Sequence, residues 1–217
     1  QGNVRGRDLG GVVADIRERI DKQIIPQLPP GYTVEIGGQF ENQQRAMRTL
    51  AIIVPIVIGL VFIMLWMTFG SVRHAAIIIV NVPLALVGGI LGLFIMREYL
   101  SVPASVGFIA LFGIAVQNGM VMVTYFNGLR KRGKSVEEAV LEGALMRLRP
   151  VLMTATTTVL GLLPLLFSNG IGSEVQRPLA AVVVFGLTTS TLLTLFVIPA
   201  AYGLVEGFFE TKKGAAA

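Results

Sequence analysis

Two neighbouring amide side chains, Gln117 and Asn118, lie in the stretch GIAVQNGMVMV (113–123), which contains no charged residue. An amide donates and accepts hydrogen bonds but does not take up a proton. Polar side chains inside a membrane face other helices or water rather than lipid. One interpretation is that the pair borders a cavity through which ions are relayed. The other is structural hydrogen bonding between helices, worth about 0.6 kcal/mol on average.

Other residue types that could carry chemistry are few. The chain has no cysteine, which excludes disulfides and thiolate metal sites. It contains no Ser-His-Asp set, phosphate-binding loop or metal-ligand cluster, so neither an enzyme nor a cofactor or metal site is predicted. His74 stands alone at the edge of an apolar run, with no second ligand near it in the sequence. The eight methionines would suit Cu(I), but Met64, Met67 and Met120 lie in apolar runs, where methionine fills space.

The segments that hold the amide pair are long and apolar. Hydrophobic residues make up 53% of the chain and charged residues 14%, against about 25% charged residues in a soluble domain. A helix of roughly 20 apolar residues crosses the hydrocarbon core of a bilayer. Five runs without Asp, Glu, Lys or Arg reach about this length: 50–70, 75–96, 103–127, 150–168 and 178–205. The sequence therefore predicts a mainly α fold, a polytopic membrane bundle of five transmembrane helices in contact with the lipid bilayer.

The second apolar run contains the sequence GGILG, which places Gly88 and Gly92 four residues apart. Small residues at this spacing let the backbone of a neighbouring membrane helix approach closely. We expect both glycines to lie in a helix-packing face.

Charges between the runs predict the orientation. The connection between the third and fourth runs is rich in basic residues: Arg130, Lys131, Arg132, Lys134, Arg147 and Arg149. By the positive-inside rule this connection and the C-terminal tail 211–217 are cytoplasmic, and the N-terminal segment is outside. Ser135 and Glu138 form a capping-box pattern, which predicts a short cytoplasmic loop helix over 135–147. The net charge of +5 gathers at membrane edges, so no nucleic-acid partner is expected.

Residues 1–40 read as a helix, a turn and a strand. Asp8 is the expected N-cap, the proline pair before Gly31 ends the helix, and alternation over 32–36 predicts the strand. One helix and one strand cannot close a core in under about 50 residues. An external segment with no signal peptide also needs preceding membrane spans. We therefore expect the chain, which starts at Gln1, to be a fragment whose N-terminal half is missing.

Taken together, the chain resembles the C-terminal part of a resistance-nodulation-division (RND) pump of the heavy-metal efflux branch, the CzcA/CusA family. The stretches that carry the resemblance run nearly end to end: RGRDLGGVVADI, LPPGYTVEIGGQFENQQRA, FGIAVQNGMVMV, EGALMRLRPVLMT, GLLPLL, GSEVQRPLA and LFVIPAAY. The resemblance implies that 1–40 ends a periplasmic porter subdomain and that 41–210 holds the last five spans. It also implies metal-cation export by proton antiport at the bacterial inner membrane. The implied assembly is a homotrimer with a periplasmic adaptor and an outer-membrane channel.

The resemblance also implies roles for the polar residues. Relatives carry lysine or glutamate at the position of Gln117, so Gln117 and Asn118 belong to the surroundings of an ion relay, with Gln117 as an orienting hydrogen-bond partner. Arg147 and Thr154 match positions that drug-exporting relatives use along a cytoplasmic proton path. For Arg147, an ordinary positive-inside anchor is the alternative. Arg149 fits the anchor better.

The substrate class follows from departures within the family. Monovalent-metal pumps carry methionine at the position of Gln176 and lysine at that of Val151, which favours divalent cations of the Zn, Co, Cd and Ni class. The protonatable carboxylates of the family lie in its first half, and none of the five runs holds an acid. One alternative is therefore a truncated, transport-incompetent membrane scaffold. Another is an RND pump for hydrophobic compounds, which is disfavoured because GIAVQNG lacks the lysine of such pumps.

Overall fold

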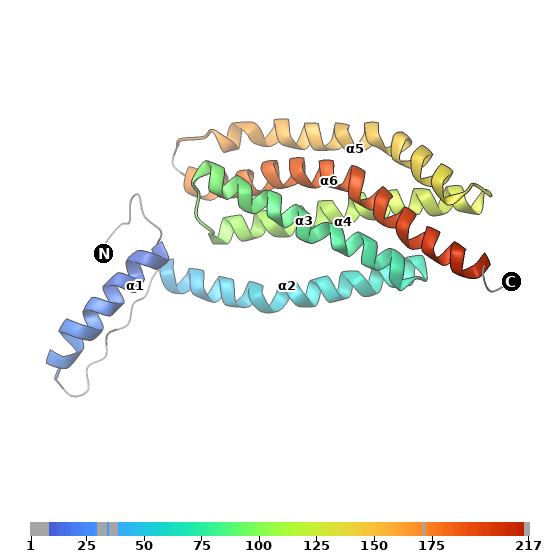
Figure 1. Cartoon of the computed structure of the whole chain (residues 1–217). Helices are drawn as coiled ribbons and strands as arrows, with labels where there is room; N and C mark the ends of the chain where they lie inside the picture. Colours follow the sequence, from blue (N-terminus) through green and yellow to red (C-terminus); the bar gives the residue numbers. More distant parts are fainter. Residues whose placement is uncertain (1–8, 30–33, 35–38, 171, 215–217) are drawn as a thin grey trace. The chain divides into compact units, whose positions relative to one another are not determined.

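The structure is a computed structural model, and it describes residues 9–29, 34, 39–170 and 172–214. Contacts divide the chain into two compact units, Gln1–Pro55 and Ile56–Ala217. Every regular element in the described residues is helical (Figure 1), which confirms the mainly α prediction. Five helices are long and apolar enough to cross a membrane, which confirms the predicted bundle. These candidate spans are Gln44–Phe69, Val72–Met96, Val102–Lys131, Val136–Leu166 and Ser173–Glu210.

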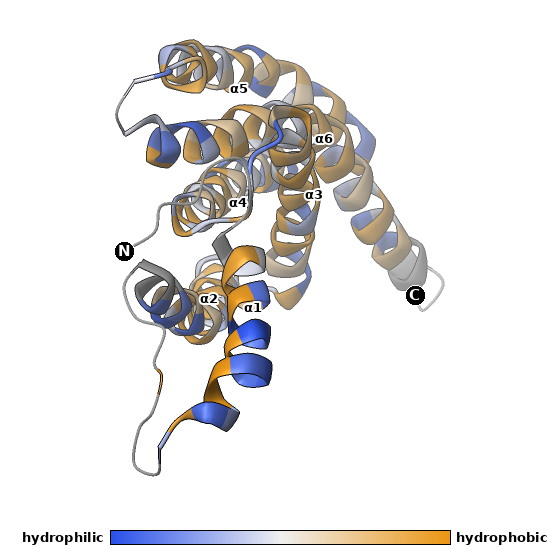
Figure 2. Ribbon diagram, turned by 90° about the vertical axis from the view of Figure 1, so that its left-hand side faces the viewer, coloured by the Kyte–Doolittle hydropathy of each residue, from blue (hydrophilic) through white to orange (hydrophobic). Residues whose placement is uncertain are grey.

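Short helical elements make up the described part of the first unit ahead of its long helix: α1 (Leu9–Arg19), the π turn η1 (Ile20–Ile24) and the 3-10 turn η2 (Ile25–Gln27). Figure 2 shows that α1 has a hydrophobic and a hydrophilic side, as expected where apolar residues recur at helical spacing. The predicted Asp8 cap lies outside the described residues. So does the predicted strand at 32–36, except Val34, which lies in no regular element.

The long helices are α2 (Gln39–Phe69), α3 (Val72–Met96), α4 (Val102–Lys131), α5 (Val136–Leu166) and α6 (Ser173–Gly214). Each is longer than the uncharged run that predicted it, because a helix can continue past the hydrocarbon while long basic side chains reach water. In α4 the additional last turn contains Arg130 and Lys131. Positive charge there is favourable beside the unpaired carbonyls at a helix C-terminus.

One long helix, α5, replaces the two elements expected between 135 and 168. The capping box is present, with Ser135 Oγ accepting from the Glu138 backbone N–H at 3.2 Å. The helix then continues through Pro150 and Pro164 to Leu166. The separation of a loop helix at 135–147 from a span beginning at 150 is therefore not found. Prolines inside membrane helices are tolerated because neighbouring groups take over the freed backbone positions.

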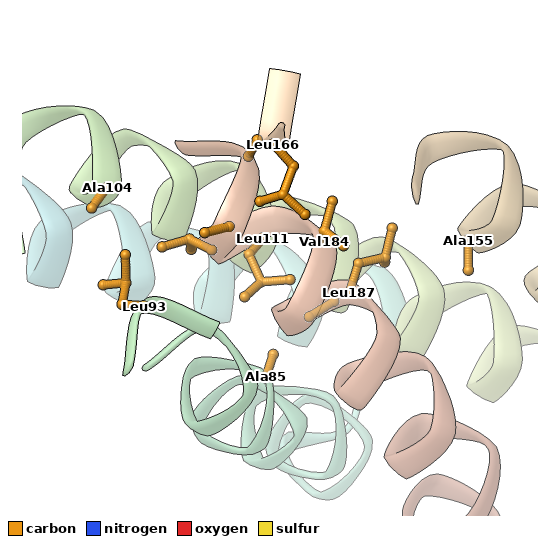
Figure 3. Packing of buried hydrophobic residues seen from close by; sticks show 12 residues of the cluster. Ala85, Leu93, Ala104, Leu111, Ala155, Leu166, Val184 and Leu187 are labelled. Carbon is orange, nitrogen blue, oxygen red and sulfur yellow. The ribbon is translucent and has the colours of Figure 1, made fainter. Parts of the chain in front are cut away.

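The second unit is built around α6, which packs against α3, α4 and α5. Figure 3 shows one buried cluster with side chains from all four helices, including Ala85, Leu111, Ala155 and Leu187. A second cluster contains Leu65 of α2 together with buried residues of α3, α4 and α6: Ala75, Ile77, Ile78, Met122, Val123, Phe126, Ile198 and Tyr202. These clusters fix the register of α4 against its neighbours.

Gly88 and Gly92 both lie on the side of α3 that meets α6. A methyl group built at Gly88 would lie 2.5 Å from Thr189 Cβ, and one built at Gly92 would lie 2.8 Å from the carbonyl oxygen of Ala181. Real Cβ atoms do not approach other atoms so closely, because interiors are already packed to contact. The two glycines therefore allow the α3 and α6 backbones to approach each other.

Candidate functional site

The predicted site residues meet in one cavity between α4 and α5. Its volume is about 210 Å³. The residues that line it are Ile114, Gln117, Asn118, Val121, Met122, Arg147, Pro150, Val151, Thr154 and Thr158. Gln117, Asn118, Arg147 and Thr154, which are up to 37 positions apart in the sequence, thus share one space.

Helical periodicity explains this arrangement. The lining residues of α4, such as Ile114, Gln117 and Val121, recur three or four positions apart, and so do those of α5. Residues at this spacing share one face of a helix. The opposite face of α4 contains Ala115 and Gly119, which are buried. One side of α4 is therefore in the core, and the other carries the amide pair.

The amide side chains of Gln117 and Asn118 differ from the other amide of α4, that of Asn127, in their hydrogen bonding. Within the described residues, no hydrogen bond is found for the side chain of Gln117 or Asn118. Gln117 is exposed, and Asn118 is half-buried. Their donor and acceptor groups are thus available to another group in the cavity.

Arg147 contributes the positive charge of the cavity. Its guanidinium carbon lies 5.0 Å from the centre of the Tyr125 ring, in a cation–π contact. Its Nε is buried and has no hydrogen-bond partner in the part of the chain that the structure describes. A buried, unpaired donor of a charged group costs free energy, so this position is suited to an acceptor supplied from elsewhere. Arg149 lies on a different surface, in a hollow lined by Leu145, Leu148 and others, and is exposed.

The threonines of α5 divide between these two surfaces. Thr154 and Thr158 line the cavity with Arg147, whereas Thr156 and Thr157 line the hollow with Arg149. Thr154 Oγ1 donates to the carbonyl of Pro150 at 3.0 Å, and Thr158 Oγ1 donates to the carbonyl of Thr154 at 2.9 Å. Each hydroxyl oxygen keeps its acceptor capacity toward the cavity.

Sequence reasoning missed a buried polar pair between α3 and α6. Asn81 Nδ2 donates to Thr194 Oγ1 at 2.7 Å, and both residues are 0% exposed. Ser190 and Thr191, on the same stretch of α6, are also buried. The available signal was Asn81 itself, an amide inside the apolar run AAIIIVNVP.

His74 also has a partner that the sequence did not indicate. Its Nε2 lies 3.2 Å from Glu206 Oε1, 132 positions away. Among residues 9–29, 34, 39–170 and 172–214, no group of three or more His, Cys, Asp or Glu side chains could hold a metal ion. One imidazole and one carboxylate provide fewer ligands than the three or four protein ligands of a zinc site.

The α4–α5 cavity can therefore orient and counterbalance a negative charge. Among the described residues, Arg147 is the only ionisable one in the lining, and no carboxylate lies there. A guanidinium stays protonated at all ordinary pH values and does not pass protons on. The residues present can thus position a proton carrier, but they do not themselves act as one.

Comparisons with known proteins give consistent matches over nearly the whole chain. A family model described as the AcrB/AcrD/AcrF family matches residues 1–206. Protein HelA of Legionella pneumophila is 49% identical over 213 residues, which are 98% of this chain and 20% of that protein. The cobalt-zinc-cadmium resistance protein CzcA of Cupriavidus metallidurans is 46% identical over 204 residues, 94% of this chain and 19% of that protein. A crystal structure of a heavy metal efflux pump superposes with a TM-score of 0.79 and 48% identity, covering 94% of this chain and 20% of that one.

Proposed function

We propose, from the premise that the chain belongs to the AcrB/AcrD/AcrF family, that it forms the C-terminal membrane portion of an inner-membrane RND pump for divalent heavy-metal cations. The observation that carries the proposal is the α4–α5 cavity, which brings Gln117, Asn118, Arg147 and Thr154 together. The chain spans 20% of the length of a relative that is 49% identical to it, so the activity belongs to a larger protein.

In this proposal the pump exchanges protons for metal ions, and Arg147 is the fixed countercharge of the proton carrier. A carboxylate from another part of the pump would enter the cavity and accept from the unpaired Arg147 Nε. Protonation of that carboxylate would weaken the pairing, because the Coulombic attraction is lost. Gln117 and Asn118 would orient the same group through their unpaired amides.

The divalent class rests on two observations. One is the 46% identity to a relative named for cobalt, zinc and cadmium resistance. The other is Val151, which is buried and lines the cavity where the resemblance places a lysine in monovalent-metal pumps. Without that second positive charge, Arg147 is the one cationic side chain that the described residues contribute to the cavity.

The proposed orientation follows the positive-inside rule. The connection between α4 and α5, with Arg130, Lys131, Arg132 and Lys134, is cytoplasmic, as is the C-terminus, and the N-terminal segment 1–40 is periplasmic. The proposed assembly is a homotrimer with a periplasmic adaptor and an outer-membrane channel. The proposed assembly comes from the family resemblance.

The proposal is tested in CzcA of Cupriavidus metallidurans, the relative named for cobalt, zinc and cadmium resistance. The segment of CzcA that matches this chain is exchanged for this chain, and the resulting hybrid pump is expressed in a bacterium whose own metal pumps have been deleted. We expect cobalt, zinc or cadmium tolerance close to that of the unmodified relative, after membrane insertion has been verified. Insertion without tolerance to any of the three metals would contradict the proposal and favour the transport-incompetent scaffold. Tolerance to hydrophobic compounds instead would favour a drug-exporting relative.

A further inference from the structure

A second cavity lies at the end of the bundle where α2 and α4 end and α3 begins. Its volume is about 660 Å³. Thr68 and Phe69 of α2, His74 of α3 and Lys131 of α4 contribute to its lining, with Tyr202 of α6. Figure 1 shows the corresponding ends of α2, α3 and α4 on the same side of the second unit. This cavity shares no lining residue with the α4–α5 cavity.

One wall of this end cavity is held by aromatic and polar contacts. The His74 ring stacks on Tyr202, with centroids 5.5 Å apart and an interplanar angle of 11°. Tyr202 Oη donates to Asn127 Oδ1 at 2.6 Å. Phe69 meets the His74 ring edge-on at 6.1 Å. The wall is therefore a built surface that joins α2, α3, α4 and α6.

The carboxylates near this wall already have partners. Glu206 Oε1 lies 3.5 Å from Arg73 Nη1 and 3.2 Å from His74 Nε2. Glu210 is paired with Arg130. A metal cation entering the cavity would have to compete with these partners for oxygen ligands, and it would be repelled by the neighbouring guanidinium groups.

Two hydrogen-bond donor groups in the lining remain available, whereas the unpartnered His74 Nδ1 is buried in the wall. Lys131 is exposed at the cavity, and within the described residues its ammonium has no ion-pair partner. Asn127 uses its Oδ1 toward Tyr202, which leaves its NH₂ group available. An ammonium and an amide NH₂ on one rim suit the oxygens of an anion.

The surroundings favour an anion attached to a lipid. On α2, Trp66 and Met67 adjoin the cavity residue Thr68 and are 48% and 77% exposed. An aromatic ring and an apolar side chain at the edge of a membrane span are suited to the boundary between headgroups and acyl chains. Basic pockets between helices at a cytoplasmic membrane face attract anionic headgroups.

We propose that this end cavity binds the phosphodiester headgroup of an anionic phospholipid of the cytoplasmic leaflet, with Lys131 and Asn127 as its donors. The shared chemistry is a phosphate oxyanion, which could also come from free phosphate. We choose the lipid as the source because Trp66 and Met67 form an exposed apolar surface beside Thr68, which acyl chains can contact. The proposal rests on the proposed cytoplasmic orientation of this end of the bundle, and it is independent of the metal and of transport activity.

The test measures binding of phosphatidylglycerol to the full chain in detergent, with phosphatidylethanolamine and inorganic phosphate as competing probes. Lys131→Ala is compared with Arg132→Ala, which removes the same charge from the neighbouring exposed position that does not line the cavity. We expect Lys131→Ala to weaken phosphatidylglycerol binding about fivefold, and Arg132→Ala to leave it within about twofold. Lys131→Arg, which keeps the charge, retains binding and serves as the folded comparison.

Equal losses in Lys131→Ala and Arg132→Ala would overturn the proposal, because general surface charge would then account for binding. Equal affinity for phosphatidylethanolamine would overturn the selectivity for an anionic headgroup. Inorganic phosphate that displaces phosphatidylglycerol at equal concentration would overturn the lipid as the source. Each comparison uses chain that elutes as a single species and has the helical circular dichroism of the unchanged protein.

Discussion

The two sides of α4 have different surroundings, with closely packed helices on one side and a cavity lined by polar side chains on the other. Toward α3 and α6, small residues bring backbones together, as where a methyl group on Gly119 would lie 3.1 Å from both Ile78 and Ile198. On that side of the bundle, Asn81 and Thr194 bond to each other in full burial. Toward α5, a cavity of about 210 Å³ remains, and the amides of Gln117 and Asn118 have no partner in the described residues.

This difference separates two uses of polar side chains in a membrane. A bonded pair in full burial holds helices in register. Asn81 Oδ1 has no hydrogen-bond partner in the described residues, but Asn81 is fully buried and lines neither cavity. Unpaired groups around a space cost free energy unless another group completes them. The α3–α6 seam is therefore the structural side of the molecule, and the α4–α5 cavity is the side suited to an ion relay.

The largest expected effect on stability comes from filling the seam. Gly92→Leu would push a side chain against Phe185 and the backbone of Ala181, so we expect a loss of about 1–3 kcal/mol or more in unfolding free energy. Gly161→Leu, where a Cβ meets nothing within 4 Å, should change stability by less than about 0.5 kcal/mol. Detergent-solubilised protein is unfolded with increasing SDS, and helicity is followed. Equal losses for the two variants would show that the seam is not closely packed.

A smaller effect is expected from the Asn81–Thr194 bond. Asn81→Ala should destabilise the chain by about 1 kcal/mol, because it leaves the Thr194 hydroxyl buried with one partner fewer. A double-mutant cycle with Thr194→Ala isolates the bond, with an expected coupling of about 0.6 kcal/mol. Strict additivity of the single losses would mean that the pair does not hold α3 to α6.

The smallest effect on stability is expected in the cavity. Gln117→Ala removes no hydrogen bond found in the described part of the protein, so unfolding free energy should stay within about 0.5 kcal/mol. In the hybrid pump the same change should lower zinc tolerance severalfold, because an orienting group is lost. Both quantities are measured on matched expression levels. Destabilisation above about 1 kcal/mol with unchanged zinc tolerance would show that Gln117 has a structural role rather than a role in transport.

The sequence could predict the helices but not all of their limits. Five apolar runs gave five membrane helices, because length and hydropathy are local properties. The continuation of α5 through Pro150 was not predicted. Arg147 and Arg149 lie just before that proline and the uncharged run starts after them, which suggested a separate span beginning at 150. A single helix can instead carry Arg147 and Arg149 on different faces.

Side-chain contacts between different helices were harder to predict than the face of a helix on which a residue lies. Periodicity assigns Gln117 and Arg147 each to a face of a helix, and the family resemblance assigned Gln117 to the surroundings of an ion relay and Arg147 to a proton path. Nothing local in the sequence joins His74 to Glu206, or Asn81 to Thr194, because these pairs are 132 and 113 positions apart. Which helix lies opposite is decided by packing of the whole unit, to which small residues such as Gly92 contribute.

The most direct test of the relay assignment compares Arg147→Ala with Arg149→Ala in the hybrid pump. Both remove one positive charge from the same helix, but only Arg147 lines the α4–α5 cavity. Zinc movement driven by an imposed pH gradient is measured in membrane vesicles that contain equal amounts of each pump. The account predicts at least about a tenfold loss for Arg147→Ala, as for one lost charge-assisted interaction, and less than about a twofold loss for Arg149→Ala. Equal rates for the two variants would contradict it.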